Sequence, residues 1–329
     1  MENAESNAVS SRPLAHFRQK TRWHPLEIAF WLCTLLPFVV TPHYLSLASQ
    51  IAITALFALS LDLILGYAGI VSLGHAAFFG VGAYTAGLIA KHYWTEPLSA
   101  LLIAAALAGL VGYATSHIIV RFRHLALIML TMGLGLLLHE AFNSASALTG
   151  GADGLQGFRV PAVLGFKFDM FGRAAYAYSL AVLFICFLVC RRIIHSPFGL
   201  ALRGIRENAT RMPAIGAPSR AHLRKAYTIA AVLAGIAGAL LTHTTSTVSL
   251  ETLSFGRSAD VLVILILGGA GRLYGGIIGA IIYMVARDQF SGINPQYWYF
   301  WIGLLLVAVV MFLPNGILGG LSRFFPRKS

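Results

Sequence analysis

The sequence lacks the residue patterns that perform enzyme chemistry. None of its five lysines follows a glycine, so it contains no phosphate-binding P-loop. It has no His-Glu-x-x-His motif and no paired-cysteine motif, and Cys33, Cys186 and Cys190 all lie in apolar runs, where a packing role is typical. We therefore predict no catalytic residue, no metal site and no cofactor. Any ATP must be hydrolysed by another chain.

Several polar residues lie within or at the edge of apolar runs, where each is costly unless it is paired or in contact with water. Ser72, His75 and Tyr84 place polar groups at membrane depth, and Gly74 lies among small residues that allow close helix contact. For Ser72 and His75 the pattern fits a hydrogen bond between helices as well as a position on a solute path. Asp62 is the deepest acid and fits the same two roles. These residues are candidates for lining a solute path.

A turn-rich segment lies at 148–154, with the sequence Leu-Thr-Gly-Gly-Ala-Asp-Gly. Clustered glycines of this kind predict tight turns between longer elements. Thr149, Gly150 and Gly151 are further candidates for the solute path, and a simple turn is the alternative.

The hydrophilic stretch 195–225 predicts a short helix outside the membrane. Ser196 is a suitable N-cap, Pro197 suits the first helical position, and a glycine follows as a stop signal. Residues 191–225 carry eight of the 24 basic residues of the chain, offset only by Glu207. A helix here can act as a rigid lever; the alternative is a basic loop that only fixes topology.

The elements that position these residues are apolar runs long enough to cross a membrane. Hydrophobic residues make up 57% of the chain, charged residues only 11%, and the mean hydropathy is +0.75. A soluble domain has about 25% charged residues, and a membrane crossing needs about 20 apolar residues. We predict an all-α fold, a polytopic transmembrane helical bundle with about 8–10 spans including short or broken helices. The predicted spans are 26–41, 45–66, 70–90, 98–120, 124–142, 174–194, 226–247, 259–271, 273–286 and 298–313.

Two of these spans, on either side of Gly271, are too short to cross independently and predict a broken helix or a re-entrant hairpin. The sequence at 266–271, Ile-Leu-Gly-Gly-Ala-Gly, also resembles Ile-Leu-Gly-Tyr-Ala-Gly at 64–69. In transporters, paired glycine-interrupted segments in two halves of the chain indicate the translocation site. Chance similarity is the alternative, since glycine is common in membrane helices.

The net charge is +12, and the basic residues lie between the apolar runs and at the two chain ends. This placement indicates membrane topology and not nucleic-acid binding. The polar start of the chain leads into an apolar run that we interpret as an uncleaved first helix. We predict a cytoplasmic N-terminal tail at 1–25, a transmembrane domain at 26–319 with the cytoplasmic loop 195–225, and a cytoplasmic basic tail at 320–329. Both termini are then cytoplasmic, and the lipid bilayer is the first partner.

Four segments together resemble the permease subunits of branched-chain amino acid ABC importers, specifically the LivM-like partner of the heteromeric LivH/LivM pair. They are Leu-Gly-Tyr-Ala-Gly with Ser-Leu-Gly-His-Ala-Ala-Phe-Phe-Gly-Val-Gly-Ala-Tyr at 65–84, the turn segment 148–154, Ser-Pro-Phe-Gly with Arg-Gly-Ile-Arg-Glu-Asn at 196–208, and Leu-Gly-Gly-Ala-Gly-Arg-Leu-Tyr-Gly within 261–275. The resemblance covers nearly the whole chain from about Leu56 to Gly319.

This resemblance implies a coupling helix within Arg203 to Gly216 that docks on an ATPase, with Arg206, Glu207 and Gly216 at family motif positions. It also implies a second, LivH-like permease, two ABC ATPase subunits, a periplasmic solute-binding protein and a bacterial inner membrane. Two positions depart from the family pattern. Pro213 predicts that the coupling helix ends early or kinks, and Asp62 replaces a frequent Asn.

The predicted function is therefore that of a permease subunit for branched-chain amino acids or similar small solutes, driven by ATP hydrolysis on partner subunits. The same architecture could import urea, short amides or aromatic acids. An ion-coupled secondary transporter is the alternative from another class; it would need a partnered buried acid and base, such as Asp62 with His75. A membrane-embedded enzyme is the weakest alternative, because no nucleophile with its base and no metal-ligand set is present.

Overall fold

The computed structural model is a bundle of helices joined by short turns. It describes residues 25–40, 42–92, 96–158, 160, 172–214, 216–313 and 315–324. Within these ranges the strand-like pairing is a single antiparallel bridge between Leu155 and Val248. The predicted all-α polytopic bundle is confirmed. The predicted N-terminal tail, up to residue 24, and residues 325–329 of the basic tail lie outside the described residues.

The first half of the chain forms both long and short helices. Its elements are α2 (Pro25–Cys33), α3 (Pro37–Val40), α4 (Leu45–Asp62) with a following π-helical turn (Leu63–Tyr67), α5 (Ala76–His92), α6 (Pro97–Ile119), α7 (His124–Ser144), α8 (Ser146–Thr149) and α9 (Arg173–Ile194).

The second half begins with two short helices and continues into the bundle. Its elements are α10 (Pro197–Glu207), α11 (Arg211–Ala214), α12 (Ser219–Thr245), the 3-10 turn Leu250–Leu253, α13 (Phe255–Gly268), α14 (Gly275–Ile293), α15 (Trp298–Phe312) and α16 (Gly316–Phe324).

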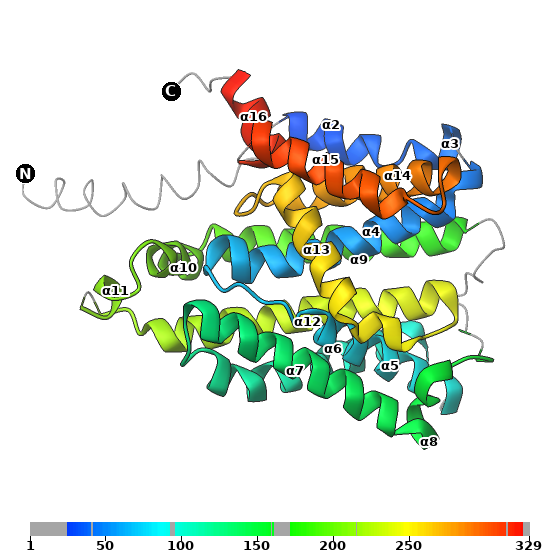
Figure 1. The fold of residues 1–329 in the computed structure, drawn as a ribbon, viewed down its shortest axis with the longest axis horizontal. Helices are drawn as coiled ribbons and strands as arrows, with labels where there is room; N and C mark the ends of the chain where they lie inside the picture. Colours follow the sequence, from blue (N-terminus) through cyan, green and yellow to red (C-terminus); the bar gives the residue numbers. More distant parts are fainter. Residues whose placement is uncertain are drawn as a thin grey trace, which may run out of the picture.

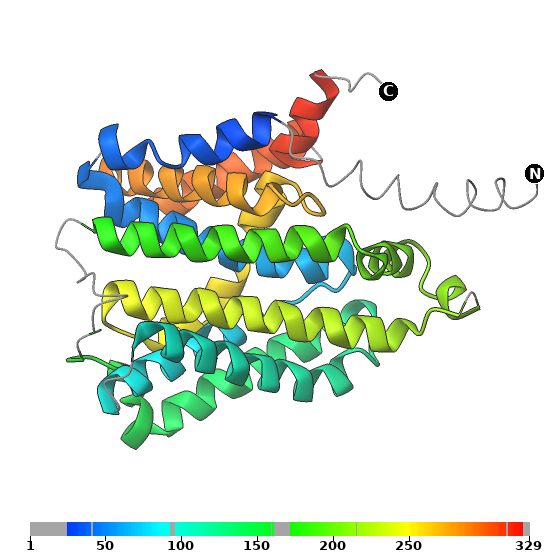
Figure 2. The same cartoon turned by 180° about the vertical axis from the view of Figure 1, so that it is seen from behind.

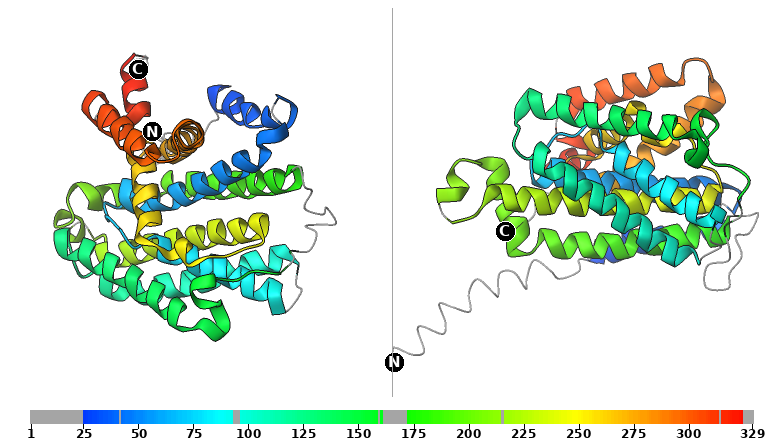
Figure 3. Two further views of the ribbon diagram at one scale, coloured as in Figure 1. Left: turned by 45° about the vertical axis from the view of Figure 1, so that its right-hand side comes forward. Right: turned by 90° about the horizontal axis from the view of Figure 1, so that it is seen from below.

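Most of the helices run nearly parallel or antiparallel to one another, and α13 is the exception (Figure 1). It is steeply inclined between a layer containing α14 and α15 and a layer containing α5, α6, α7 and α12, as the left view of Figure 3 also shows. The helices α10 and α11 project from one end of the bundle, which we call the α10 end (Figure 2). The turn after α12 and the C-terminal end of α14 lie at the opposite end.

The helices α4 and α12 form the centre of the bundle. In the most apolar stretch of each helix, the buried share is 78% for α4 and 72% for α12 but only 17% for α7. The helix α12 packs closely on α5: a Cβ atom at Gly238 would lie 1.9 Å from the carbonyl oxygen of Phe79, and one at Gly82 would lie 2.1 Å from that of Gly235. Such small residues let membrane helices associate through backbone contact.

Two predicted spans are wrong near one end because an interruption in the helix was not recognised. The span 70–90 becomes helical only at Ala76, because the chain leaves α4 through Gly69, which has a φ of +74°. The span 26–41 is divided into α2 and α3 at Pro37, which lacks the N–H needed to continue a helix.

Two other predicted spans are shorter than the observed helices because polar residues continue the helix beyond the apolar run. The helix α12 begins at Ser219 and not at Ala226, and α14 continues to Ile293 and not only to Ala286. Between them α13 has 14 residues, which is about 21 Å at 1.5 Å per residue and too short for a core of about 30 Å. The predicted interruption around Gly271 is present as the non-helical residues 269–274.

Candidate functional site

The helix α10 begins where the sequence predicts it. The Ser196 hydroxyl accepts a hydrogen bond from the backbone N–H of Gly199 at 3.4 Å, and Pro197 occupies the first helical position. Leu202 and Ile205 are 0% and 3% exposed, so one face of α10 is held against the bundle. The helix contacts α9, α12 and the π-helical turn after α4.

The predicted coupling helix at 203–216 is not continuous. The helix α10 ends at Glu207, and the Asn208 carboxamide oxygen then accepts hydrogen bonds from the backbone N–H groups of Thr210 and Arg211 at 3.2 and 3.0 Å, which starts α11. The break therefore comes before Pro213, which lies inside α11. Such side-chain to backbone hydrogen bonds are the means by which Asn competes with a helix interior.

The helix α10 contacts the interruption of α4 through two arginines. A guanidinium N–H of Arg206 donates a hydrogen bond to the carbonyl oxygen of Gly66, and the guanidinium carbon of Arg203 lies 5.2 Å from the centroid of the Tyr67 ring. Both partners belong to the π-helical turn, in which the regular hydrogen-bonding ladder of α4 changes. A cationic donor therefore holds a backbone carbonyl at the point where α4 ends.

The two similar sequences at 64–69 and 266–271 meet at this same point. A carboxylate oxygen of Asp62 accepts a hydrogen bond of 2.6 Å from the backbone N–H of Gly271, although 209 positions separate the two residues. A Cβ atom on Gly66 would lie 2.4 Å from that nitrogen, and Gly271 has a φ of +79°. We call this group of Asp62, Gly66, Gly271 and Arg206 the break junction, because it joins the interruption after α4 to the one between α13 and α14.

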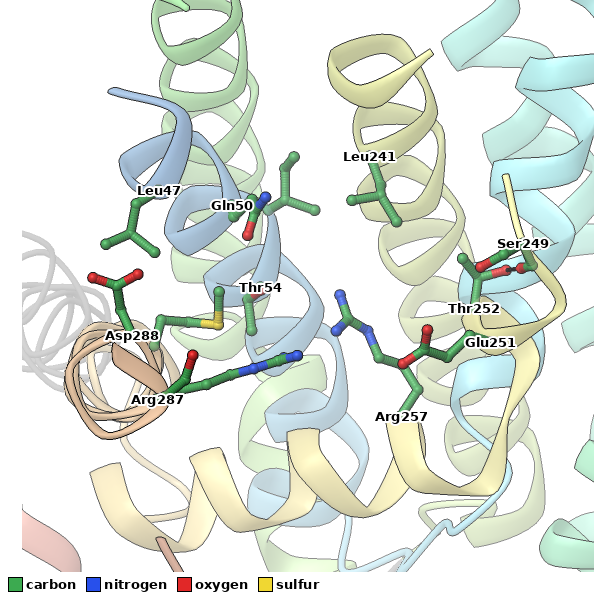
Figure 4. Close-up of a pocket in the computed structure, with 13 residues that line it drawn as sticks. Leu47, Gln50, Thr54, Leu241, Ser249, Glu251, Thr252, Arg257, Arg287 and Asp288 are labelled. Atoms are coloured by element: carbon green, nitrogen blue, oxygen red, sulfur yellow. Dashed lines mark hydrogen bonds between the residues drawn. The ribbon is translucent and has the colours of Figure 1, made fainter. Parts of the chain in front are cut away.

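A polar cavity lies nearer the opposite end of the bundle. It has a volume of about 320 Å³ and lies between α4, α12, α13 and α14 beside the turn Leu250–Leu253 (Figure 4). Charged residues from three elements line it, namely Glu251, Arg257, Arg287 and Asp288. The remaining polar lining includes Gln50, Thr54, Ser249, Thr252 and Ser291, and the apolar lining consists of Leu47, Ile53, Leu241 and Met284.

Residues 43–310 match the family described as the branched-chain amino acid transport system permease component. The chain belongs to this family of permease components. It is 28% identical over 304 residues to a high-affinity branched-chain amino acid transport system permease protein LivM of Escherichia coli, an alignment that covers 86% of this chain and 71% of that protein. No solved structure matches the chain.

Two further relatives have related names. The LivM protein of Salmonella typhimurium is 29% identical over 310 residues, covering 86% of this chain and 71% of that protein. A probable LivM protein of Methanocaldococcus jannaschii is 24% identical over 316 residues, covering 79% of this chain and 89% of that protein. With six described helices long and apolar enough to cross a membrane, the permease is a multi-pass membrane protein.

Within the permease, the predicted path residues Ser72, Gly74 and His75 lie in the segment between α4 and α5. The His75 Nε2 atom lies 2.8 Å from the Ser60 hydroxyl, and the imidazole ring stacks on Phe57. A Cβ atom on Gly74 would lie 1.9 Å from a backbone oxygen of α7, and Ser72 is fully buried. The bond to Ser60 ties this segment to α4.

The other predicted path residues lie in turns and core contacts near the opposite end. The Tyr84 ring packs against Phe142, and the Thr149 hydroxyl accepts a hydrogen bond from the backbone N–H of Gly151 at 3.2 Å. Gly150 and Gly151 have φ values of +78° and +59°. They therefore form the turn that the glycine pattern predicts.

All eight predicted path residues are described, and none of them lines the polar cavity; their role in transport stays a prediction. The predicted coupling residues lie together on α10 except Gly216, which follows α11, is exposed and has a φ of +85°. Glu207 is exposed at the end of α10.

The charged residues of the polar cavity were not among the residues predicted from the sequence. Glu251 and Arg257 lie before one short apolar run, and Arg287 and Asp288 lie just after the next, so all four fall within predicted loops. The available signal was their position: charges of both signs flank the two short segments around Gly271. Because α13 begins earlier and α14 ends later than the apolar runs, Arg257, Arg287 and Asp288 belong to helices of the bundle, and Glu251 lies in the turn before α13.

Proposed function

We propose that the permease forms, with a second LivH-like permease, the transmembrane path of an ATP-driven importer for branched-chain amino acids or similar small solutes. ATP hydrolysis takes place on two partner ATPase subunits, and a periplasmic binding protein delivers the solute. The names of the relatives support this solute class, since each is described as a branched-chain amino acid transport permease. The sequence supports the separate ATPases, because it contains no P-loop.

The contact between α10 and the break junction is the observation that carries this proposal. The α10 end is the cytoplasmic side in this assignment, since residues 191–225 hold eight of the 24 basic residues. Both termini are placed on that side, and the membrane is the bacterial inner membrane. The projecting α10 and α11 are then the surface on which an ATPase docks (the right view of Figure 3).

Movement of α10 would reach the solute path through two hydrogen bonds. When ATP closes the ATPase pair, α10 moves and Arg206 carries the movement to the carbonyl of Gly66. The bond from Gly271 to Asp62 passes it to the segment between α13 and α14, the two helices that bear the cavity arginines. Alternating access then follows as one arrangement of these interrupted helices is favoured over another.

The partners of Asp62 and His75 argue against an ion-coupled secondary transporter. Such a carrier would use a buried acid and base that interact with each other. Here Asp62 accepts from the backbone of Gly271, whereas His75 bonds to Ser60. Each side chain has a structural partner of its own.

Purification from native membranes in mild detergent, followed by mass spectrometry of the co-eluting proteins, tests the proposed function. We expect recovery of a second permease and of two ATPase subunits with this chain. An Asn208→Ala variant gives a sharper test, because it removes the acceptor that separates α10 from α11; the ATPase should be lost from the purified complex before the second permease. Recovery of a stable homo-oligomer of this chain alone would contradict the proposal and favour a secondary transporter.

A further inference from the structure

Two arginine side chains enter the polar cavity from different helices without forming an ion pair with a described residue. Arg257 belongs to α13 and Arg287 to α14, and Figure 4 shows the two side chains pointing toward one another across the cavity. The described part of the chain contains one ion pair within 4.0 Å, between Arg191 and Glu27, which lies elsewhere. An ionised side chain within a membrane bundle is costly and indicates a functional site.

Aromatic rings hold both guanidinium groups in place. The guanidinium carbon of Arg257 lies 5.5 Å from the centroid of the Phe79 ring, and that of Arg287 lies 5.0 Å from the centroid of the Trp298 ring. Such contacts stabilise the cation through the ring face and leave the N–H donors free. Both arginines therefore keep donors in the planar arrangement that binds a carboxylate through two parallel hydrogen bonds.

The rest of the cavity suits the other groups of an amino acid. Glu251 and Asp288 supply carboxylates that can receive an ammonium group, and the apolar lining from Leu47, Leu241 and Met284 suits an aliphatic side chain. The volume of about 320 Å³ lies at the lower end of the range for small-ligand pockets, about 300–1,000 Å³.

We propose that the polar cavity binds the solute as a zwitterionic α-amino acid, with Arg257 and Arg287 holding its carboxylate and Glu251 or Asp288 facing its ammonium group. This assignment rests on the proposed function and names the residues that bind the solute in the path. It also distinguishes among the solutes that the sequence left open. Urea and short amides have no carboxylate, so they would leave both guanidinium groups without an anion.

Uptake by the complete transporter in lipid vesicles, with the binding protein outside and ATP inside, tests this site. L-leucine is the probe, and the variants are Arg257→Gln and Arg287→Gln, each of which removes one cationic donor. We expect each to lower the initial rate of leucine uptake at least about tenfold, the loss expected when a charge-assisted hydrogen bond to the solute is removed. Arg173→Gln is the matched control, since Arg173 is exposed at the start of α9 and lies outside the cavity lining; it should transport as the wild type does.

A second measurement uses the wild-type complex and does not depend on the folding of a variant. In detergent and without the binding protein, L-leucine should raise the melting temperature of the complex, and L-leucinamide, which lacks the carboxylate, should not at the same concentration. Wild-type uptake by both variants, or equal stabilisation by the two ligands, would overturn the carboxylate site. Absence of ATP-driven leucine uptake by the wild-type transporter would instead overturn the proposed function.

Discussion

An Arg206→Ala variant of the permease is expected to take up roughly 10- to 150-fold less leucine for each ATP hydrolysed, because it lacks the hydrogen bond that connects α10 to the break junction. Arg206 donates to the carbonyl of Gly66, and a hydrogen bond from a charged group contributes about 1.5–3 kcal/mol. At 1.4 kcal/mol for each tenfold change, this energy shifts the balance between two conformations by that factor. The measurement is the ratio of leucine taken up to phosphate released in vesicles containing the complete transporter.

The matched control for this variant is Arg192→Ala. Arg192 is an exposed arginine at the same end of the bundle, on the last turn of α9, so its removal changes the local charge equally. We expect the ratio of uptake to ATP hydrolysis to stay within about twofold of the wild type, since surface charges contribute about 0–1 kcal/mol. Equal ratios for Arg206→Ala and Arg192→Ala would contradict the role given to Arg206.

A Gly66→Ala variant is expected to disrupt the close contacts within the break junction. The added Cβ atom would lie 2.0 Å from a carboxylate oxygen of Asp62 and 2.4 Å from the backbone nitrogen of Gly271. The Gly271 nitrogen belongs to the backbone, and the Asp62 oxygen is held by its hydrogen bond to that nitrogen, so the interruptions after α4 and α13 must separate. Overpacking in a closely packed interior costs about 1–3 kcal/mol and sometimes more. We expect leucine uptake to fall at least about tenfold and the melting temperature of the purified complex to fall.

Two other variants show whether this loss comes from the close contact. Gly303→Ala places the same methyl group in α15, where no heavy atom of another described element lies within 4 Å, and it should leave uptake and melting temperature unchanged. Asp62→Asn keeps an oxygen that can accept from the Gly271 N–H, so uptake should remain largely intact if Asp62 is structural. A wild-type melting temperature for Gly66→Ala, or a complete loss of uptake by well-assembled Asp62→Asn, would contradict this description of the junction.

The features that could be predicted from the sequence are those that depend on local composition. Long apolar runs identify α6, α7, α9 and α15 because each helix must be apolar along its length to cross a membrane. The start of α10 was predictable because Ser196 and Pro197 act within the first turn of the helix. The interruption around Gly271 was predictable because the two apolar runs beside it are each too short to cross the membrane independently.

The contacts between distant parts of the chain could not be predicted in this way. The sequence marks Asp62 as a buried acid, but the choice of the Gly271 backbone N–H as its partner depends on how α13 is inclined across the bundle. The hydrogen bond from Arg206 to the carbonyl oxygen of Gly66 also could not be predicted, because the two residues are 140 positions apart. The cavity arginines were missed for another reason. The start of α13 and the end of α14 are helical but contain polar residues, and the length of an apolar run does not predict helix in such segments.

Leucine uptake into vesicles that contain the purified transporter and ATP but no ion gradient shows directly whether ATP drives this permease. The binding protein and labelled L-leucine are added outside, and the α10 end with its ATPase subunits faces the ATP. We predict accumulation of leucine that requires ATP and stops when a non-hydrolysable analogue replaces it. Leucine uptake that is independent of ATP and appears only when a proton or sodium gradient is imposed would contradict ATP-driven import.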